Sequence, residues 1–368
     1  MQRIVFLLPE LAGGGAERAC AMLASSLPRE RFEPLLLLQH RTVRQYPVAS
    51  HVQVLELGID NPGRALIPLR RTLGKLAPAA VYAALPHLNA MAVAAAWTMS
   101  RRPRVIVSVH NNTALEYADL GKRWLRIGEP LTYALADAVV CVSQGVADTL
   151  RTLTPHGQNK VRVIPNPVDV AEIARSSRQV SDHPWFQGEH RVVLAAGRLV
   201  PQKDYPMLLR AFTLVHATCP DARLLILGEG PLRQQLSSEV KELGLSGLVE
   251  MPGRVDNPYP YFAAAACLAQ ASRYEGFGMA LVEAQAASCP VAATDCPYGP
   301  AEVLDHGRLG LLSAVGDPAG FAGNVVRLLD DPALAAQLRE EGLVAARNYA
   351  PEKVAASLAD LLSGLCDI

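Results

Sequence analysis

The sequence predicts an α/β fold with two doubly wound domains, each a parallel sheet covered by helices on both faces. Three observations lead to this prediction. The chain has 368 residues, and single cores usually stop growing near about 250–300 residues. Short apolar runs alternate with helical patterns along almost the whole chain, as in βα units. A polar stretch splits the alternation into two series, so the simplest architecture is two domains that face each other across a cleft.

The first series predicts an N-terminal domain over residues 1–169. Its strands are short apolar runs, which is typical of parallel strands buried on both faces. Helical patterns separate these runs, so the connections are expected to be crossover helices. The predicted strands are residues 4–8, 33–38, 52–55, 79–84, 105–109, 138–142 and 161–164.

A linker is predicted between the two series. Residues 165–169 end the first series, and residues 170–190 are polar and contain Pro184 and Gly188, a composition typical of loops. The alternation then resumes and predicts a second domain over residues 191–350. Its expected strands are residues 192–195, 223–227, 248–250, 264–269, 291–293 and 310–312.

Composition sets further expectations. Hydrophobic residues make up 50% of the chain, yet no apolar segment approaches the roughly 20 residues that span a bilayer. The first strand runs directly into a Gly-rich loop, so no signal peptide is expected. The seven cysteines are scattered, and none forms Cys-x-x-Cys. Buried reduced thiols are therefore expected rather than a disulfide framework or a zinc site, and the protein is expected to be cytoplasmic.

Charge is distributed unevenly although the formal net charge is zero. Residues 1–180 carry 21 Lys and Arg against 13 Asp and Glu (+8), and residues 181–368 carry 14 against 22 (−8). A solvated basic face is one interpretation. The other is attraction to anionic lipid or a pyrophosphate-linked acceptor, worth about 1 kcal/mol per basic residue near such a surface. No nucleic acid partner is expected. The basic clusters are residues 64–75, 101–104 and 122–126, the last around Trp124.

Residues 272–283 predict a strand-to-helix turn, the place where open α/β sheets bind their ligands. The apolar run 263–271 before it predicts a buried strand, and the Ala-rich segment after it predicts a helix. Gly276 and Gly278 allow the backbone to approach a ligand closely. The free N–H groups of the first helical turn, near Met279, offer an anion site, and a phosphate is expected there.

Two carboxylates lie eight positions apart across this turn. Glu275 is in the loop, and Glu283 falls about one turn into the helix, from where it can point back at the same ligand. Such a pair can grip sugar hydroxyls at both ends of a nucleotide sugar, with the phosphates between them. Charged helix faces also produce this spacing, so the pair alone does not decide the function.

The Glu-Gly-Phe-Gly core of residues 275–278, inside the Glu-x7-Glu spacing, closely resembles the donor-binding signature of the retaining glycosyltransferases of family 4. These are two-domain enzymes with the GT-B fold. The resemblance implies that Glu275 and the 276–278 backbone contact the donor sugar and diphosphate, and that Glu283 holds the ribose hydroxyls. It also implies that a C-terminal helix, residues 351–368, packs back on the first domain.

Two glycine-rich turns lack the dinucleotide fingerprint Gly-x-Gly-x-x-Gly, which disfavours an NAD oxidoreductase. The first, with Gly14 and Gly15, has Arg18 where the last glycine belongs. It resembles the family's N-terminal phosphate and acceptor loop, although a tight structural turn is the alternative. The second begins at Gly228 and has Arg233 at that place. It resembles the family's Gly-x-Gly-Pro, which implies either contact with the nucleotide or backbone support of the cleft.

Basic residues and a histidine follow two predicted strands. Arg198 and Lys203 leave the first strand of the second domain in a Gly- and Pro-containing loop, where they can neutralise a diphosphate. They resemble the family's Gly-Arg-Leu-x-x-x-Lys pattern. Asp204 stands where many relatives have Gly, which we interpret as variation in a helix cap. His110 ends strand 105–109, at the edge of the sheet expected to face the cleft, and the family has a histidine there near the donor sugar.

Family resemblance supplies the remaining assignments. Residues 251–255 are implied to form the wall that holds the base, through Arg254 and Val255. Ser143 and Asn166 match family positions, but capping or hinge roles are equally open to them. No Asp-x-Asp motif is present, so no metal or other cofactor is expected. The basic side chains and the helix N-terminus would take over the charge role of a metal.

The sequence therefore predicts a metal-independent retaining glycosyltransferase that uses a UDP-sugar. Residues 295–302 resemble a segment of bacterial enzymes that build lipid-linked and cell-surface glycans, which makes such a glycan the expected acceptor and peripheral membrane contact an expectation. A nucleotide-sugar epimerase or hydrolase and a non-catalytic sugar-nucleotide-binding module are the alternatives. The expected catalytic residues are His110, Arg198, Lys203 and Glu275; the expected donor-binding residues are Gly14, Gly15, Gly228, Arg254, Val255, Glu275, Gly276, Phe277, Gly278, Met279 and Glu283.

Overall fold

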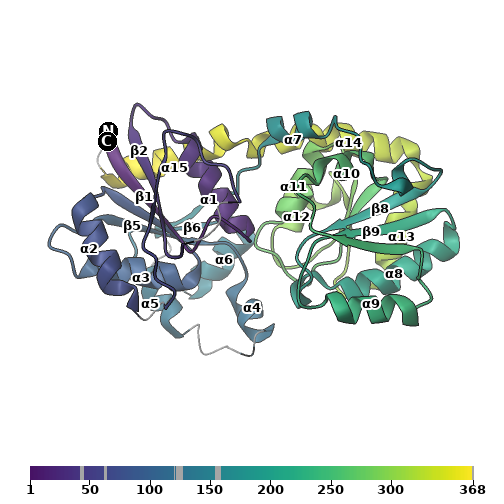
Figure 1. The fold of residues 1–368 in the computed structure, drawn as a ribbon, viewed down its shortest axis with the longest axis horizontal. Coiled ribbons are helices and arrows are strands. Elements are labelled where there is room, and N and C mark those ends of the chain that lie inside the picture. The colour runs from purple at the N-terminus through teal and green to yellow at the C-terminus, as the bar shows by residue number, and fades with distance from the viewer. Residues whose placement is uncertain (42–44, 62–63, 120, 122–126, 154–158, 367–368) are drawn as a thin grey trace. The chain divides into compact units, whose positions relative to one another are not determined.

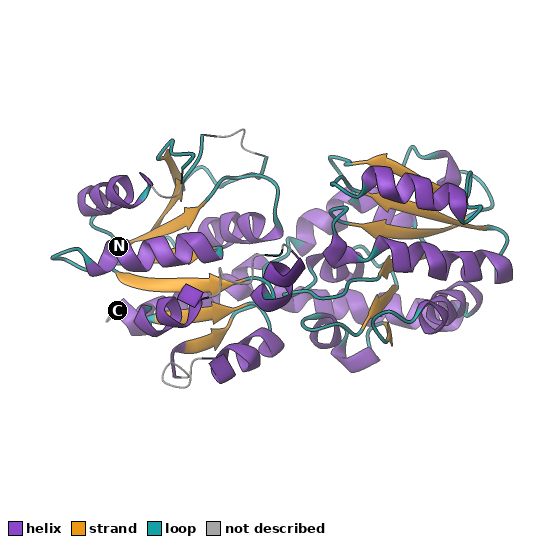
Figure 2. Ribbon diagram, turned by 90° about the horizontal axis from the view of Figure 1, so that it is seen from below, coloured by secondary structure: helices purple, strands orange, loops and turns teal. Residues whose placement is uncertain are grey.

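A computed structural model describes residues 1–41, 45–61, 64–119, 121, 127–153 and 159–366. The chain divides into two compact units: unit 1 comprises Met1–Val168 and Tyr349–Ile368, and unit 2 comprises Asp169–Asn348. Each unit has one sheet with helices on both faces (Figures 1 and 2). All strand pairs of the described residues are parallel. The predicted class of fold, with two parallel sheets, is confirmed. The basic cluster at 122–126, with Trp124, lies outside the described residues.

Unit 1 has a seven-stranded sheet with the order β3-β2-β1-β4-β5-β6-β7. Each strand overlaps one of the apolar runs in the sequence. Its strands are β1 (Gln2–Leu8), β2 (Phe32–Leu38), β3 (Gln53–Glu56), β4 (Ala80–Ala84), β5 (Arg104–Val109), β6 (Ala138–Cys141) and β7 (Val161–Val163). Its helices are α1 (Gly15–Ser26), α2 (Leu66–Leu76), α3 (Pro86–Trp97), α4 (Thr113–Asp119), α5 (Glu129–Leu135), α6 (Gln144–Leu153) and α15 (Pro351–Cys366).

The core of unit 1 forms around β1, the central strand. Phe6 pairs in register with Tyr82 of β4, and their ring centroids are 5.2 Å apart. Burial of large apolar side chains on both faces of such a strand stabilises the fold by about 1.5–3 kcal/mol each. Helix α15 contacts α1, and its Val354, Leu358 and Leu362 are buried in the same core. The last helix thus belongs to unit 1 although it follows unit 2 in the sequence.

Unit 2 has a six-stranded sheet with the order β10-β9-β8-β11-β12-β13. Its strands are β8 (Arg191–Ala196), β9 (Ala222–Leu227), β10 (Val249–Gly253), β11 (Cys267–Gln270), β12 (Val291–Thr294) and β13 (Leu311–Ser313). Its helices are α7 (Val170–Ser176), α8 (Tyr205–Thr218), α9 (Arg233–Glu242), α10 (Tyr259–Ala264), α11 (Met279–Ala286), α12 (Pro300–Val303), α13 (Pro318–Asp330) and α14 (Pro332–Ala346), with 3₁₀ turns η4 (Pro184–Phe186), η5 (Pro201–Lys203), η6 (Asp305–Gly307) and η7 (Arg347–Tyr349).

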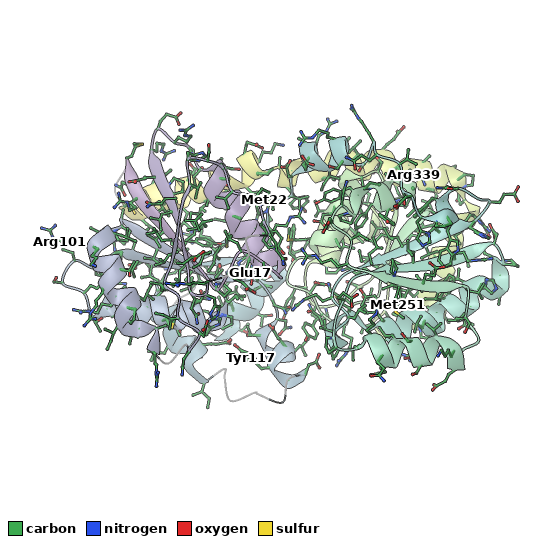
Figure 3. The ribbon with its side chains drawn as sticks, in the orientation of Figure 1. Glu17, Met22, Arg101, Tyr117, Met251 and Arg339 are labelled. Carbon is green, nitrogen blue, oxygen red and sulfur yellow. The ribbon has the colours of Figure 1, made fainter. Side chains whose placement is uncertain are left out.

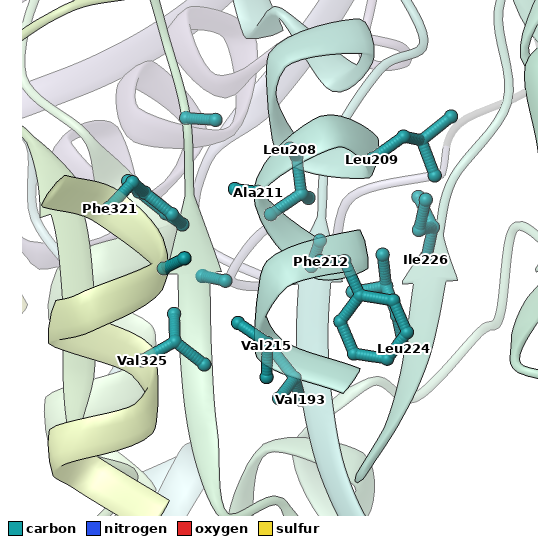
Figure 4. Packing of buried hydrophobic residues seen from close by; sticks show 14 of the residues in the cluster. Val193, Leu208, Leu209, Ala211, Phe212, Val215, Leu224, Ile226, Phe321 and Val325 are labelled. Carbon is teal, nitrogen blue, oxygen red and sulfur yellow. The ribbon is translucent and has the colours of Figure 1, made fainter. Parts of the chain in front are cut away.

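Helices α8 and α13 lie side by side and cover one face of this sheet (Figure 4). Phe212 of α8 and Phe321 of α13 are at most 1% exposed, and they pack with Val193 and Ile226 of the strands beneath them. Side chains fill the interior of each unit in the same way (Figure 3). The sheet edges that carry the loops are therefore held on rigid, well-packed elements.

The strand order reverses next to the central strand of each sheet. In unit 2 the chain moves outward from β8 through β9 to β10 on one side, and from β11 through β12 to β13 on the other. The loops that follow β8 and β11 therefore leave the same edge at the point where the sheet opens. Open α/β sheets bind ligands at such a switch point. Residues 197–204 and 271–278 are those two loops.

Two parts of the predicted organisation are wrong. Residues 170–190 were expected to be a linker, but they contain α7 and η4 and belong to unit 2. Asp169 caps α7 by accepting a hydrogen bond from Glu172 N at 2.9 Å, and Ile173 is fully buried. The apolar run 263–271 is likewise not all strand. Its first two residues end α10, because Ala-rich apolar runs suit a helix as well as a strand.

All seven cysteines are free thiols, and six of them are buried. The expectation of buried thiols without a disulfide framework is confirmed. Within the described ranges, no helix has the length and apolar character needed to cross a bilayer.

Candidate functional site

The N-terminus of α11 is open to a ligand. Gly278 is its N-cap, with φ 93° and ψ 54°, and no side chain caps the helix. A Cβ atom at Gly278 would lie 2.9 Å from Cδ1 of Leu281, so a larger residue would strain the backbone and crowd the first turn. Leu281 N donates to the Gly278 carbonyl at 2.9 Å, whereas the N–H groups of Met279 and Ala280 have no acceptor among the described residues, and the helix dipole adds partial positive charge there. This turn can therefore bind an anion such as a phosphate.

The Glu275 carboxylate is held beside this turn by three donors. Its Oε1 atom accepts hydrogen bonds from Ser272 Oγ at 2.7 Å and from Gln270 Nε2 at 3.2 Å. The Lys203 ammonium forms an ion pair with the same oxygen. Glu275 is 5% exposed, and a carboxylate this deeply buried needs such partners because an unpaired buried charge is strongly destabilising. With Oε1 fixed, the direction of Oε2 is fixed as well.

The loops after β8 and β11 are tied together by hydrogen bonds. Gln202 donates from its side-chain amide to the Tyr274 carbonyl at 3.0 Å. The backbone carbonyl of Gln202 accepts a hydrogen bond from the backbone N–H of Arg273 at 2.8 Å. Because Gln202 is the neighbour of Lys203, these bonds hold the ammonium at the Glu275 carboxylate. The predicted pair of Lys203 and Glu275 is thus brought into direct contact, although 72 positions separate them in the sequence.

The segment after β12 supports the Glu275 loop through its backbone. Glu275 N donates to the Pro297 carbonyl at 2.9 Å, and Tyr298 N donates to the Glu275 carbonyl at 3.0 Å. Gly299 has φ 87°, and a Cβ there would lie 2.4 Å from the Phe277 carbonyl oxygen. Two short loops therefore press against each other, and the Glu275 side of the site has little freedom to move.

Lys203 and Arg198 share a loop but differ in surroundings. The Lys203 side chain is 17% exposed and lies across Gly197, where a Cβ would be 3.4 Å from Lys203 Cε. Arg198 is exposed and, in the part of the chain that is described, has no ion-pair partner, so it can meet an anion. Asp204 adopts a left-handed conformation (φ 44°) and caps α8 by accepting from Met207 N at 3.2 Å. The predicted helix cap at Asp204 is confirmed.

Gly228 allows the backbone segments that follow β8 and β9 to lie close together. A Cβ at Gly228 would lie 1.9 Å from the Gly197 carbonyl oxygen, a distance that no side chain tolerates. Gly228 N donates to the Gly253 carbonyl at 2.8 Å, and Gly197 N donates to the Leu227 carbonyl at 2.9 Å. The ends of β8, β9 and β10 thus meet at Gly228. Of the two roles expected for this glycine, the geometry favours support of the binding edge.

The other predicted donor-side residues lie at the same edge of the unit 2 sheet. Glu283 is 8% exposed on α11, and Met279 is its half-buried first residue. Arg254 and Val255 follow β10, two strands away from β8, with Arg254 exposed. The structure therefore groups Glu283 and Met279 with the Glu275 loop and places Arg254 and Val255 further along the edge.

His110 ends β5 in unit 1, and its ring is oriented by Ser108. The Ser108 hydroxyl donates to the Ala83 carbonyl at 2.9 Å, so its Oγ, 2.9 Å from His110 Nε2, accepts a hydrogen bond from that nitrogen. This assigns the Nε2–H tautomer and leaves Nδ1 as an acceptor. Nδ1 is buried and has no hydrogen bond of acceptable geometry within the described residues, although Asn166 lies close by. Burial lowers the pKa of His110 to about 4, and Asn166 opposes this shift.

Replacing His110 with Gln should weaken the pH dependence of stability. A histidine whose pKa falls from 6.5 to about 4 on folding binds more protons unfolded than folded between those values. Its contribution to stability is present above pH 6.5 and is lost as the pH falls toward 4. Denaturant unfolding at several pH values gives the unfolding free energy as a function of pH. Between pH 4 and 6.5, the slope of that curve should correspond to up to one fewer proton taken up on unfolding in the His110→Gln variant than in the wild type. An unchanged slope would contradict a neutral His110, and His190→Gln in unit 2 is the control.

The glycine loop before α1 is less suited to an anion. Gly14 is the N-cap of α1, and Glu17 in the first turn folds back over it (Figure 3). A Cβ at Gly14 would lie 2.2 Å from Glu17 Oε2. The negative charge of this 8% exposed side chain repels a phosphate at Gly14 and Gly15. The N-terminus of α11 is therefore the better phosphate site.

Two family models match the chain, one after the other. Residues 13–172 match Glycosyltransferase Family 4, and residues 176–344 match Glycosyl transferases group 1. The chain is a glycosyltransferase with a family 4 domain followed by a group 1 domain. The Lys203–Glu275 pair and the uncapped start of α11 lie within the second of these matches, in unit 2.

Relatives of the glycosyltransferase agree with this assignment. It is 25% identical to the Campylobacter jejuni enzyme named N-acetylgalactosamine-N,N'-diacetylbacillosaminyl-diphospho-undecaprenol 4-alpha-N-acetylgalactosaminyltransferase, over 99% of this chain and 100% of that protein. It is 30% identical to the lipopolysaccharide core biosynthesis glycosyltransferase LpsE of Rhizobium meliloti, over 56% of this chain and 58% of LpsE.

Solved structures show the same GT-B fold. Anabaena HepE in complex with UDP and glucose has a TM-score of 0.80 and 20% identity, with 99% of this chain and 100% of HepE covered. Sucrose-phosphate synthase from Thermosynechococcus elongatus has a TM-score of 0.82 and 19% identity, with 99% of each chain covered. The GT-B architecture predicted from the sequence is therefore confirmed.

Sequence reasoning missed the residues that hold the site together. Gln202 and Gln270 act through side-chain amides, and Thr294 donates to the Ser272 carbonyl at 2.6 Å. In unit 1, Ser108 orients His110. A signal was present for Gln270, Thr294 and Ser108, because each is a polar residue in an otherwise mostly apolar strand, and buried polar groups normally have hydrogen-bond partners.

Proposed function

We propose that this glycosyltransferase moves a hexose or N-acetylhexosamine from a UDP-sugar to a glycan acceptor, with retention of configuration and without a metal. One observation carries the proposal: a buried carboxylate, Glu275, is fixed by Lys203 beside the uncapped N-terminus of α11. These groups supply what a nucleotide sugar needs at one place, namely an acceptor for sugar hydroxyls and positive charge for phosphates.

Each group has a role toward the donor. The diphosphate would lie at the start of α11, with the exposed Arg198 and the Lys203 ammonium beside it. Oε2 of Glu275 would accept a hydrogen bond from a hydroxyl of the donor sugar, and Glu283 would hold the ribose hydroxyls. His110 of unit 1 would stay neutral during the reaction, because burial lowers its pKa to about 4. Support for UDP comes from HepE, a protein of the same fold solved with UDP and glucose.

The reaction proceeds by departure of the diphosphate. The bond between the anomeric carbon and the phosphate oxygen breaks, and UDP leaves with the electron pair. The acceptor hydroxyl attacks the same face of the sugar, and its proton passes to the leaving phosphate oxygen. Lys203, Arg198 and the α11 N-terminus stabilise the charge that develops on UDP. Preorganised groups of this kind each contribute roughly 100-fold or more to turnover.

The acceptor we propose is a lipid-linked or cell-surface glycan. The C. jejuni relative is named for a diphospho-undecaprenol glycan, and LpsE is named for lipopolysaccharide core biosynthesis. A glycan carried on such a lipid stays at a membrane, so the enzyme would work as a peripheral protein at that surface. The basic surface of unit 1 is consistent with this location.

Release of free UDP from a panel of UDP-sugars tests the proposal, with and without an extract of lipid-linked glycans. Release from one donor that depends on the extract is the expected result, and it names the sugar. Release without an acceptor would favour the alternative, a nucleotide-sugar hydrolase or epimerase of this fold. Binding of UDP without any turnover would favour a non-catalytic sugar-nucleotide module.

A further inference from the structure

A long acid-free stretch runs through unit 1. Residues 61–115 contain no Asp or Glu but seven Lys or Arg. Asp60 and Glu116 bound the stretch. All seven basic side chains are exposed: Arg64, Arg70, Arg71, Lys75, Arg101, Arg102 and Arg104. A surface built from this stretch therefore carries positive charge with no negative charge of its own.

The fold gathers these residues on neighbouring helices. Helix α3 contacts α2 on one side and α5 on the other, and Figure 1 shows the three helices together in unit 1. The turn 98–104 follows α3, and its Arg101 stands at the margin of the unit (Figure 3). Glu129 of α5 is buried and accepts a hydrogen bond from Thr113 Oγ1 at 3.0 Å, so it is not an exposed acidic side chain of this surface. We call the exposed side of residues 64–76, of α3 and α5, and of residues 98–104 the basic face.

Large apolar side chains stand among the charges of the basic face. Ile67 of α2 is 61% exposed, Trp97 of α3 is 53% exposed, and Leu131 of α5 is 63% exposed. Inward-facing Leu69 and Leu73 anchor α2 to the unit. Leu66 of α2 is also 36% exposed, so each of the three helices presents at least one large apolar side chain to the solvent.

Trp97 is held rigidly while half of it stays exposed. Its indole Nε1 donates to the Leu135 carbonyl at 3.1 Å, and the Arg102 guanidinium lies 4.5 Å from the centre of its ring. Arg102 in turn pairs with Asp137 at 2.8 Å. A fixed, amphipathic aromatic ring beside basic side chains suits the boundary between water and lipid.

Four bases of the basic face are uncompensated. Asp137 also pairs with Arg104 at 3.3 Å, and Arg70 donates to the Thr98 carbonyl at 3.3 Å. Arg64, Arg71, Lys75 and Arg101, by contrast, have no side-chain hydrogen bond or ion pair to any described residue. Their charge is available to a partner.

We propose that the basic face docks on an anionic phospholipid leaflet, with Ile67, Trp97 and Leu131 entering the headgroup region. The proposal rests on the proposed function and names the surface by which the enzyme would reach a lipid-linked acceptor. Charge complementarity favours anionic lipid, and exposed apolar side chains on three neighbouring helices suit a planar interface. A protein partner with an acidic surface is the competing occupant.

Neutralising the four uncompensated bases tests the docking. The variant carries Arg64→Gln, Arg71→Gln, Lys75→Gln and Arg101→Gln. Each basic residue near an anionic surface strengthens binding about fivefold, so the variant should bind vesicles of phosphatidylcholine and phosphatidylglycerol at least about 100-fold more weakly than the wild type. The matched control has the same change of charge on exposed residues of unit 2: Arg178→Gln, Lys241→Gln, Arg327→Gln and Arg339→Gln.

Flotation of the protein with vesicles gives the readout. The wild type and the control variant should float with phosphatidylglycerol vesicles, less so in high salt, and neither should float with phosphatidylcholine alone. Ile67→Ser with Leu131→Ser should weaken the binding that survives in high salt. Equal flotation of the basic-face variant and the control would overturn the proposal. So would a wild type that binds no vesicles, the result expected if an acidic protein is the partner.

Failure of docking is separable from failure of the proposed function. UDP binding is measured without vesicles, and none of the substituted residues belongs to the donor site. If the basic-face variant binds UDP normally but not vesicles, both proposals stand. If the wild type floats but releases UDP from no donor, the docking surface stands and the proposed transferase activity does not.

Discussion

Replacing Lys203 with Met should lower kcat/KM about 100-fold or more and should also destabilise unit 2. The activity falls because a charge that stabilises the leaving diphosphate is removed from a preorganised site. Stability falls because Glu275, 5% exposed, loses its ion pair and keeps only the hydrogen bonds from Ser272 and Gln270. Breaking a buried pair in this way costs about 3–5 kcal/mol. UDP-release kinetics and denaturant unfolding measure the two effects.

A double variant separates catalysis from stability. Lys203→Met with Glu275→Gln removes both charges, so the unfolding free energy should recover most of the loss seen in Lys203→Met alone. The activity should not recover, because neither charge is present to act on the donor. Near-normal kcat/KM in Lys203→Met would contradict the catalytic role. Strictly additive stability losses in the double variant would contradict the buried ion pair.

Gly228→Ala should cost unit 2 about 3 kcal/mol or more of unfolding free energy, the upper end for an overpacked site. The new Cβ would lie 1.9 Å from the Gly197 carbonyl oxygen, and the backbone has φ 143°. The three atoms nearest the new Cβ all belong to the backbone of Gly197, so no side-chain rotation can relieve the contact. Because the ends of three strands meet here, the loop that carries Lys203 would shift as well. Thermal or denaturant unfolding measures the loss.

Gly247→Ala is the matched control for Gly228→Ala. Gly247 also has a positive φ, 78°, but a Cβ there would meet no atom within 4 Å. Only the conformational cost of a left-handed alanine remains, about 1–2 kcal/mol. Equal losses in the two variants would show that the close approach at Gly228 relaxes without cost.

The sheets could be predicted from the sequence because parallel strands buried on both faces read as apolar runs. Each of the thirteen strands among the described residues overlaps such a run, and the turns after β8 and β11 were marked by glycines and charged residues. Once those two strands are neighbours, Lys203 and Glu275 must come from the same edge. The sequence therefore predicted Lys203 and Glu275 as site residues. It did not predict their contact, because that contact depends on the strand order of the sheet.

Other features lay beyond a pattern in the sequence. The left-handed conformation of Asp204 and the convergence of Gln270 and Ser272 on one oxygen of Glu275 depend on tertiary packing. The predicted linker failed for a different reason. Asp169 and Glu172 have the spacing of a helix-start motif, but the prediction rested only on the polar composition of residues 170–190 with Pro184 and Gly188.

Calorimetric titration of UDP into the enzyme in EDTA tests the central claim most directly, namely that Lys203 and the N-terminus of α11 bind the donor diphosphate without a metal. The wild type should bind UDP in EDTA, and added Mg²⁺ should not tighten the binding. Lys203→Met should bind roughly 10-fold to 100-fold more weakly, the effect of one charge-assisted hydrogen bond. Binding that requires Mg²⁺, or equal affinity of the two proteins, would contradict the account.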